Sequence, residues 1–360
     1  MKILVVKLHA LGDIVIITPA IRRLRTAFPD AEIQLLTTGW AEPAIRYSRA
    51  LDQIITVPTK TFFQKSMSST LAQLKLIFKL RIYKYDAVII FHRHRYIKLL
   101  FKLTGIPIQC SFTWHPGGNG VVLDETKHSA LTAIELAEFA ISRLGGTSKD
   151  NICFDSLRYE WYITNQENVD AVSALKRLEL IPNEYIMIFP GGGKNPSDDG
   201  FERRWGPVGF GEVAKYVYRV YGMKSLLAGA VSDTEVCRET HSYVGKIALD
   251  ISGKYNIRAT AALMAKSAFV LTNDSAPLHI AAAVNSPVIG IFGPTAAKYK
   301  LPPNKNSHGV FTGIQCSPCY FTTFKGCIYN TYKCMTELSS DLVANKVDEV
   351  MRLRSVESIQ

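Results

Sequence analysis

The 360-residue sequence predicts two successive α/β domains, each built on a parallel β-sheet. Short runs of β-branched apolar residues alternate with segments of helical periodicity, and this alternation occurs twice along the chain. The chain is too long for one ordinary core and suits two domains. With 47% hydrophobic and 20% charged residues, the composition is that of a globular protein and excludes a disordered chain.

The first series opens with an apolar run at residues 3–6, which predicts a strand, followed by a turn at Gly12 and Asp13. A helix is expected over 14–27, and Pro19 marks either a kink or the true first turn because proline has no amide hydrogen to donate. The same alternation predicts strands at 32–37, 53–57 and 86–91 and helices at 41–47, 71–82 and 129–144.

A second series follows a lapse in periodicity at about 145–165, where we place the domain boundary. We expect a first domain at 1–160, a second at 161–338 and a final helix within 339–360 that packs back on the first domain. The second series has predicted strands at 185–189, 224–228, 268–272 and 288–292 and helices at 208–221, 234–244, 275–284 and 340–354. Ligands of open parallel sheets bind at the carboxyl ends of the strands, so the turns after these strands are candidate sites.

The formal charge of +11 and the pI of about 9.2 favour a negatively charged partner: a nucleic acid, a nucleotide or an anionic membrane surface. No apolar run is long enough to span a bilayer, and Lys7 interrupts the only apolar run near the start, so no secretory signal is expected. These features predict a cytoplasmic protein, and in a reducing cytosol disulfides are not expected.

Asp13, in the turn after the first strand, is the first candidate site residue. As a carboxylate at the edge of the sheet it could take a proton from an acceptor hydroxyl. The alternative is a helix N-cap, in which the side chain accepts a hydrogen bond from an exposed amide. The turn lacks the full GxGxxG pattern, so the sequence gives no dinucleotide fingerprint.

The segment 272–279 lies between a buried strand and a helix. The amides of Ser275 and Ala276 would sit at the helix N-terminus, which favours an anion such as a diphosphate, and Pro277 suits a first helical turn. Asp274 could orient these groups or bind a ribose hydroxyl. The alternative is an ordinary capped helix in which His279 is packed or exposed.

Two further turns carry candidates. Gly191 and Gly192 follow a strand, where glycines let the backbone approach phosphates, and Arg203 could neutralise a diphosphate. The alternative is a flexible surface loop with solvated charges. Asp233 or Glu235, after another strand, could bind a ribose; the alternative is a helix start with acidic residues in its first turn.

Four cysteines and a basic stretch complete the candidates. Cys316, Cys319, Cys327 and Cys334 could hold a structural zinc or iron ion, and the alternative is unligated thiols. The stretch 75–102 interleaves Lys and Arg with aromatic residues, which fits anionic lipid headgroups; the alternative is a solvated helix face.

As a set, these motifs resemble glycosyltransferase family 9, the ADP-heptose:lipopolysaccharide heptosyltransferases. Residues 2–21 resemble the opening of the family, and 272–279 resemble its donor-binding Asp-Ser/Thr-Gly-x-x-His motif. Segment 289–295 resembles the strand and loop that follow, and 190–207 the phosphate loop with a basic residue before tryptophan. The cysteine tail recurs in many members, and the likeness spans nearly the whole chain.

This resemblance implies a GT-B fold, in which two Rossmann-like domains face each other across a cleft. It implies inverting, metal-independent transfer of a heptose from ADP-heptose, bound by the C-terminal domain, to a lipopolysaccharide core or related glycan on the N-terminal domain. Together with the basic stretch at 75–102, it predicts peripheral contact with the anionic inner face of the cytoplasmic membrane and no nucleic-acid partner.

The resemblance also assigns roles to residues. Asp13 falls on the catalytic base, Arg203 on the phosphate-binding cation where Lys is usual, and Asp233 near the ribose-binding acid. The other implied donor-binding residues are Gly191, Gly192, Asp274, Ser275, Ala276 and His279. The sequence departs from the family pattern by an insertion at 194–201, by Gly206 between Trp205 and Pro207, and by Ala276 in place of the usual Gly.

Two rival functions stay open at this point. One is a GT-B transferase or epimerase that uses another nucleotide sugar. The other is a basic nucleic-acid-binding protein with a four-cysteine metal site, which would explain the charge and the cysteines but not the two α/β series.

Overall fold

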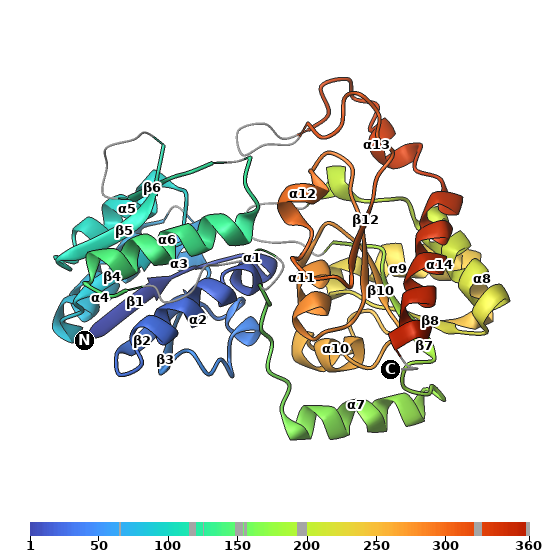
Figure 1. Cartoon of the computed structure of the whole chain (residues 1–360), viewed down its shortest axis with the longest axis horizontal. Coiled ribbons are helices and arrows are strands. Elements are labelled where there is room, and N and C mark those ends of the chain that lie inside the picture. The colour runs from blue at the N-terminus through green and yellow to red at the C-terminus, as the bar shows by residue number, and fades with distance from the viewer. Residues whose placement is uncertain are drawn as a thin grey trace. The chain divides into compact units, whose positions relative to one another are not determined.

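The computed structural model describes residues 1–64, 66–114, 120–124, 126–147, 154, 157–192, 200–319 and 326–357. The chain divides into two compact units, Met1–Trp161 and Tyr162–Gln360. In its described part, each unit is built on one six-stranded parallel sheet with helices packed against it (Figure 1). The α/β class and the two parallel sheets predicted from the sequence are confirmed.

The sheet of the first unit has the strand order β3-β2-β1-β4-β5-β6. Its strands are β1 (Lys2–Val6), β2 (Glu32–Thr38), β3 (Gln53–Val57), β4 (Ala87–Ile90), β5 (Ile108–Thr113) and β6 (Gly120–Val122). The chain winds outward from β1 in both directions, so the sheet has a topological switch point between β1 and β4. Ligands of such sheets bind at the carboxyl ends of the strands beside the switch point.

Helices of the first unit pack against the sheet through apolar side chains. They are α1 (Leu11–Ile16), α2 (Thr18–Ala27), α3 (Lys60–Phe63), α4 (Met67–Tyr83), α5 (Arg95–Lys102) and α6 (Ser129–Arg143). On one face, Leu80 of α4 and Phe101 of α5 join Val6 and Ile90 in one buried cluster. The predicted helix at 14–27 is divided at Ile17, so that Pro19 lies in the first turn of α2.

The predicted helix at 41–47 is wrong, since only a single 3-10 turn, Glu42–Ala44, forms there. A segment this short gains too few hydrogen bonds to hold a helix without strong packing.

The second unit repeats the winding of the first, with strand order β12-β11-β10-β7-β8-β9. Its strands are β7 (Tyr185–Phe189), β8 (Lys224–Leu227), β9 (Ala248–Asp250), β10 (Val270–Asn273), β11 (Val288–Ile291) and β12 (Ser307–Val310). Here the switch point lies between β7 and β10. Gly191 lies in the loop after β7 and Ser275 in the loop after β10, so the two residues flank the same switch point.

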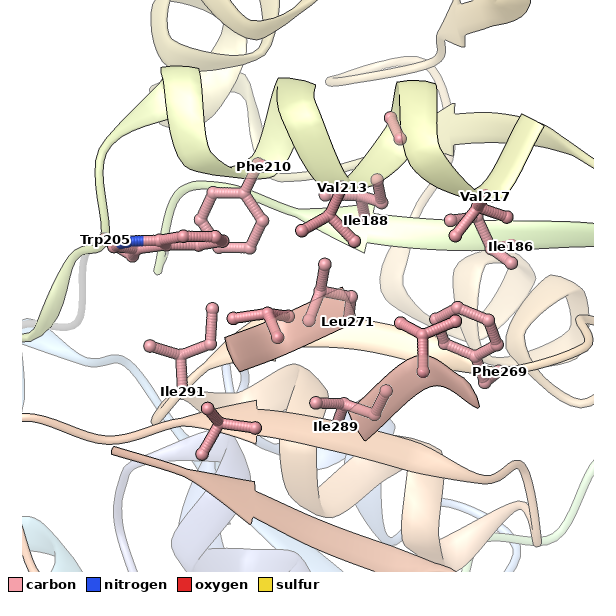
Figure 2. Close-up of a cluster of buried hydrophobic side chains, with 14 of the residues drawn as sticks. Ile186, Ile188, Trp205, Phe210, Val213, Val217, Phe269, Leu271, Ile289 and Ile291 are labelled. Carbon is pink, nitrogen blue, oxygen red and sulfur yellow. The ribbon is translucent and has the colours of Figure 1, made fainter. Parts of the chain in front are cut away.

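Alternate residues of the central strands of this unit face opposite layers of helices. The helices are α7 (Asn165–Arg177), α8 (Pro207–Tyr221), α9 (Thr234–Val244), α10 (Ile257–Met264), α11 (Ala276–Ala283), α12 (Ala297–Lys300), α13 (Lys333–Thr336) and α14 (Ser340–Glu357). Ile188 and Ile186 of β7 pack beneath Val213 and Val217 of α8, respectively, and Trp205 closes the end of this layer beside Phe210 (Figure 2). The Tyr185 hydroxyl donates instead to the Leu263 carbonyl of α10, on the other face (2.6 Å).

The last helix, α14, belongs to the core of the second unit. Its Val343, Val347 and Val350 are buried in that core, and Asp348 accepts hydrogen bonds from the hydroxyls of Tyr216 and Tyr221 (2.8 and 2.7 Å). Within the second unit, the apolar stripe of this helix packs against α8. Packing of the helix on the first domain stays a prediction. Among the described residues, no helix combines the length and the apolarity needed to cross a bilayer.

Glu167 links α7 to α10 within this unit. Its carboxylate accepts the Thr164 amide in a capping box (2.8 Å) and pairs with the buried Arg258 guanidinium (2.5 and 2.8 Å). The hydrogen bond from Arg258 is the main reason that the pKa of Glu167 falls from its ordinary 4.5 to about 2.

Glu167→Gln is expected to lower the free energy of unfolding at pH 7 by up to about 3 kcal/mol. Because the folded-state pKa is depressed, this contribution is complete above pH 4.5 and is lost as the pH falls toward 2. Urea denaturation at about pH 7 and about pH 3 should show a large difference between wild type and variant that shrinks at the lower pH. The control, Glu184→Gln at an exposed position, should match the wild type. A difference independent of pH would contradict the prediction.

Candidate functional site

The turn after β1 holds Asp13 beside a buried lysine. Asp13 lies in the first turn of α1, whose N-cap is Ala10, so the helix-capping alternative for Asp13 is not what forms. The Lys7 ammonium donates to Asp13 Oδ2 at 2.8 Å and to the Phe91 carbonyl, after β4, at 3.4 Å. The Lys7 side chain is 11% exposed and that of Asp13 46%, so the carboxylate is open to solvent while its cation is not.

Two histidines lie close enough to interact with this pair. The His92 ring accepts the Leu8 amide hydrogen at Nε2 (2.6 Å), and the rings of His9 and His92 stack at 5.3 Å. Burial, with a smaller effect of Lys7, lowers the pKa of His9 to about 4, and burial holds the pKa of His92 well below its ordinary value. Both imidazoles are therefore neutral at pH 7, and Lys7 supplies the positive charge next to Asp13.

Lys7 is a site residue that sequence reasoning missed. Its signal in the sequence is a lysine at the end of an apolar strand, six residues before the carboxylate. A charge-assisted hydrogen bond from this buried lysine holds the carboxylate in place.

Lys7→Met is expected to lower kcat/KM by about tenfold, because the Asp13 carboxylate loses the charged hydrogen-bond donor that contacts its Oδ2 at 2.8 Å. The measurement is kcat/KM at pH 7, together with the melting temperature. Lys2→Met, at the other end of β1, is the matched control and should leave kcat/KM in place. An unchanged kcat/KM in a folded Lys7 variant would contradict the role assigned to Lys7.

In the second unit, Asp233 holds together the loops after β7 and β8. This buried carboxylate accepts the amide hydrogens of Ala230 (3.0 Å) and Gly192 (3.5 Å). A methyl group at Gly191 would lie 2.4 Å from Asp233 Oδ1, and one at Gly229 would lie 2.7 Å from the Asp233 Cβ. Only glycine fits at these two positions. The Asp233 carboxylate also fixes the path of the loop at Gly191 and Gly192, which we call the glycine loop.

Two side chains make contacts at the end of β10: Asn273 bonds to the glycine loop, and Arg203 bonds to the residue after the strand. The Arg203 guanidinium donates to the Asp274 carbonyl (3.2 Å) and lies 3.9 Å from the Asp274 carboxylate. Asn273 donates to the carbonyls of Pro190 (3.0 Å) and Gly191 (2.8 Å).

Asn273 is the second residue that sequence reasoning missed as a site residue. Its side-chain oxygen accepts the Trp205 amide hydrogen (2.9 Å), so one buried amide group joins three segments that are distant in the sequence. Its only signal in the sequence is a polar residue at the end of a buried strand.

The N-terminus of α11 is open beside this cluster. Its N-cap, Ser275, makes no side-chain capping bond; the Ser275 hydroxyl instead lies 3.3 Å from the Thr272 hydroxyl and the Asn273 carbonyl. A Cβ at Gly192 would be 3.9 Å from the Ser275 Cβ. Ser275 and Ala276 are partly exposed, whereas His279 is buried.

The structure thus brings together Gly191, Gly192, Arg203, Asp274 and Ser275 at one sheet edge, where amide donors and a cation suit an anion. Residues 193–199, which include most of the expected insertion, lie outside the described residues.

The model of glycosyltransferase family 9 (heptosyltransferase) matches residues 73–328, more than two thirds of the chain. The chain belongs to glycosyltransferase family 9. A lipooligosaccharide heptosyltransferase 2 of Campylobacter jejuni is 26% identical over 206 residues, a match that spans 54% of this chain and 63% of that relative.

Solved structures of two bacterial glycosyltransferases share the fold. The E. coli ADP-heptose lipopolysaccharide heptosyltransferase II superposes with a TM-score of 0.75 at 19% identity and covers 99% of this chain and 100% of its own. The iron-containing glycosyltransferase TibC of enterotoxigenic E. coli has a TM-score of 0.58 at 12% identity and covers 98% of this chain and 78% of its own. The expected GT-B class is therefore confirmed.

The four cysteines of this family 9 chain line one small pocket in the second unit, together with Pro294 and Tyr332. Burial, then the neighbouring thiols, raises the pKa of Cys334 to about 11. Backbone amides at Tyr332 and Thr331 lower the pKa of Cys327. Among the described residues, no three or more His, Cys, Asp or Glu side chains are arranged as an ion-binding group.

Trp205 anchors the segment that carries Arg203. Its indole Nε1 donates to the Leu338 carbonyl (3.1 Å), and its ring leaves room only for glycine at position 209, where a Cβ would lie 2.3 Å from the ring.

Gly209→Ala is expected to lower the free energy of unfolding by about 1–3 kcal/mol, since the indole and the helix backbone must move apart. Thermal denaturation measures the effect. Gly206→Ala is the control, because a Cβ there meets no atom within 4 Å. Equal melting temperatures for the two variants would show that Trp205 is not held as described.

Proposed function

We propose that this family 9 enzyme transfers a heptose from ADP-heptose to a lipopolysaccharide core or related glycan, with inversion at the anomeric carbon. The observation that carries the proposal is the cluster at the β7–β10 switch point. There, Arg203, the glycine loop and the open N-terminus of α11 offer positive charge and amide donors to a diphosphate.

The proposed donor site divides these residues by role. Gly191 and Gly192 let the backbone approach the diphosphate, Ser275 and Ala276 present the helix N-terminus, and Arg203 neutralises charge. Asp274, just before that helix, and the buried His279 within it complete the proposed donor site. Asp233, whose carboxylate accepts loop amides, shapes the glycine loop next to the ribose.

The proposed reaction is a single displacement that needs no metal. Asp13 takes the proton of the acceptor hydroxyl, and the hydroxyl oxygen forms a bond to the anomeric carbon of the heptose. The bond from that carbon to the diphosphate oxygen breaks, and ADP leaves with its negative charge stabilised by Arg203 and backbone amides. Lys7 holds the carboxylate in position through its hydrogen bond to Oδ2.

A donor screen tests the proposal. ADP-heptose should raise the melting temperature and support ADP release in the presence of a lipopolysaccharide core acceptor, whereas UDP-sugars should do neither. A larger thermal shift with a UDP-sugar would favour the alternative GT-B transferase or epimerase. Salt-sensitive binding of DNA or RNA in a gel shift would favour the nucleic-acid alternative.

The cysteine pocket supports a second proposal, a structural zinc or iron ion. Four thiols around one pocket are a donor set that both metals take, and the amides directed at Cys327 would stabilise its thiolate. Elemental analysis should find about one metal ion per chain, and Cys316→Ser should remove it, while Cys110→Ser, elsewhere in the chain, should not. A metal-free wild type would refute this site. The ion, when bound, would brace the loop and take no part in sugar transfer.

A lipopolysaccharide acceptor is anchored in a bilayer. The proposed function therefore includes work in the cytoplasm, in peripheral contact with the anionic inner face of the cytoplasmic membrane.

A further inference from the structure

Helix α4 of the first unit is apolar on two sides. Leu76 and Leu80 are buried in one cluster with strand residues, and Ile77 is also buried, as expected for a helix of a globular domain. A second stripe, at helical spacing, faces solvent: Met67 is 83% exposed, Phe78 62% and Ile82 79%. Leu71 and Leu74 are exposed on the same stripe. A globular core does not require this second stripe.

Helix α5 continues the exposed apolar surface. The Arg81 guanidinium of α4 donates to the Leu103 carbonyl at the end of α5 (3.0 Å), and the Tyr96 hydroxyl of α5 bonds to Gln73 of α4. The two helices are therefore fixed next to each other. Tyr96, Leu99 and Leu103 are each at least 44% exposed. We call the exposed residues of both helices the α4–α5 face.

The charge around this face is strongly positive. Between Lys60 and Lys102 the sequence has ten Lys and Arg residues and one acid, Asp86, so this stretch carries +9 of the net +11. Exposed cations on or beside the face include Lys75, Lys79, Arg81, Lys84 and Lys102. Long aliphatic stems let such side chains keep their charge in a polar layer while the neighbouring apolar residues enter a nonpolar one.

We propose that the α4–α5 face docks on an anionic lipid bilayer, with its apolar stripe in the headgroup and upper acyl region and its lysines on the phosphates. Charge and composition favour this occupant over a protein. Protein interfaces are depleted in lysine, and a symmetric contact with a second copy would place the cations of one face, such as Lys75 and Lys79, against the same cations of the other. An anionic bilayer satisfies both the apolar and the cationic residues.

The proposal rests on the proposed function only for its purpose, which is to hold the enzyme where a lipid-anchored acceptor lies. The test is co-sedimentation of the full chain with vesicles of phosphatidylglycerol and phosphatidylethanolamine, and with pure phosphatidylcholine vesicles. We expect binding to the anionic vesicles that weakens with added salt. Phe78→Glu/Ile82→Glu and Lys75→Glu/Lys79→Glu should each weaken binding at least about tenfold.

The matched control is Val169→Glu/Val172→Glu on α7, where two exposed valines occupy a surface outside the α4–α5 face; it should bind as the wild type does. All variants should keep the wild-type melting temperature and the wild-type rate on a lipid-free, water-soluble acceptor. Vesicle binding is measured without any donor, so failure of the proposed transferase activity would not obscure it.

Three results would overturn the docking proposal. The first is that the wild type and both face variants bind anionic vesicles equally. The second is that the wild type binds neutral vesicles as well as anionic ones. The third is that the wild type forms an oligomer without lipid and that Phe78→Glu/Ile82→Glu dissociates it. The last result would assign the face to a second copy of the chain.

Discussion

Replacing Asp13 with asparagine is expected to lower kcat by about 10²–10⁴-fold and to leave ADP binding unchanged. The substitution keeps the size of the side chain, and its amide is too weak a base to take the proton of the acceptor hydroxyl. The donor residues belong to the second unit, so the thermal shift produced by ADP should equal that of the wild type. Steady-state rates of ADP release, together with that thermal shift, measure both expectations.

The control for this change is Asp30→Asn, which alters an exposed carboxylate of the same unit. It should leave kcat and the melting temperature unchanged. A fully active Asp13 variant would remove Asp13 from the chemistry and would leave the reaction without its proposed base.

Arg203→Ala is expected to reduce kcat by about 10²–10³-fold, because the leaving diphosphate loses a cation that is most needed as its charge develops. Arg203→Lys should recover most of the rate, since lysine is a point charge that still reaches a phosphate and is the residue usual in the family. ADP affinity should fall in the alanine variant and be largely restored in the lysine variant.

Arg219→Ala is the matched control, because this arginine lies on α8 over the Tyr216 ring. Its kinetics should not differ from the wild type. If Arg203→Ala and Arg203→Lys lost activity equally, the guanidinium would act through its hydrogen bond to the Asp274 carbonyl and not through its charge.

The sequence predicted the elements whose periodicity is strong. Buried strands such as β7 and the long helices α6 and α8 lie within about two residues of their expected bounds. Helix α4 begins earlier than expected because the Ser66 hydroxyl accepts the Ser69 amide hydrogen and caps it (3.2 Å). Helix α10 went unpredicted because nearly every residue in it is buried, which removes the two-sided pattern of an amphipathic helix.

The candidate site was only partly visible in the sequence. Glycine loops and an acidic turn after a strand have local patterns, so Gly191, Ser275 and Asp13 could be found one at a time. The side chains that hold these residues in place depend on the folded structure. Asn273 bonds to residues more than 80 positions away, and Lys7 contacts Asp13 because the chain turns between β1 and α1. The pattern of apolar residues along the sequence does not predict such hydrogen bonds, so they are seen only in the folded structure.

Each unit closes its own core around its own sheet, and this separation has an evolutionary consequence. Residues in the turns after β1 or β4 can change without disturbing the packing beneath the glycine loop, since distant sites combine nearly additively. Sequence change at the sheet edge of the first unit can thus accumulate while the core that supports the second sheet stays as it is.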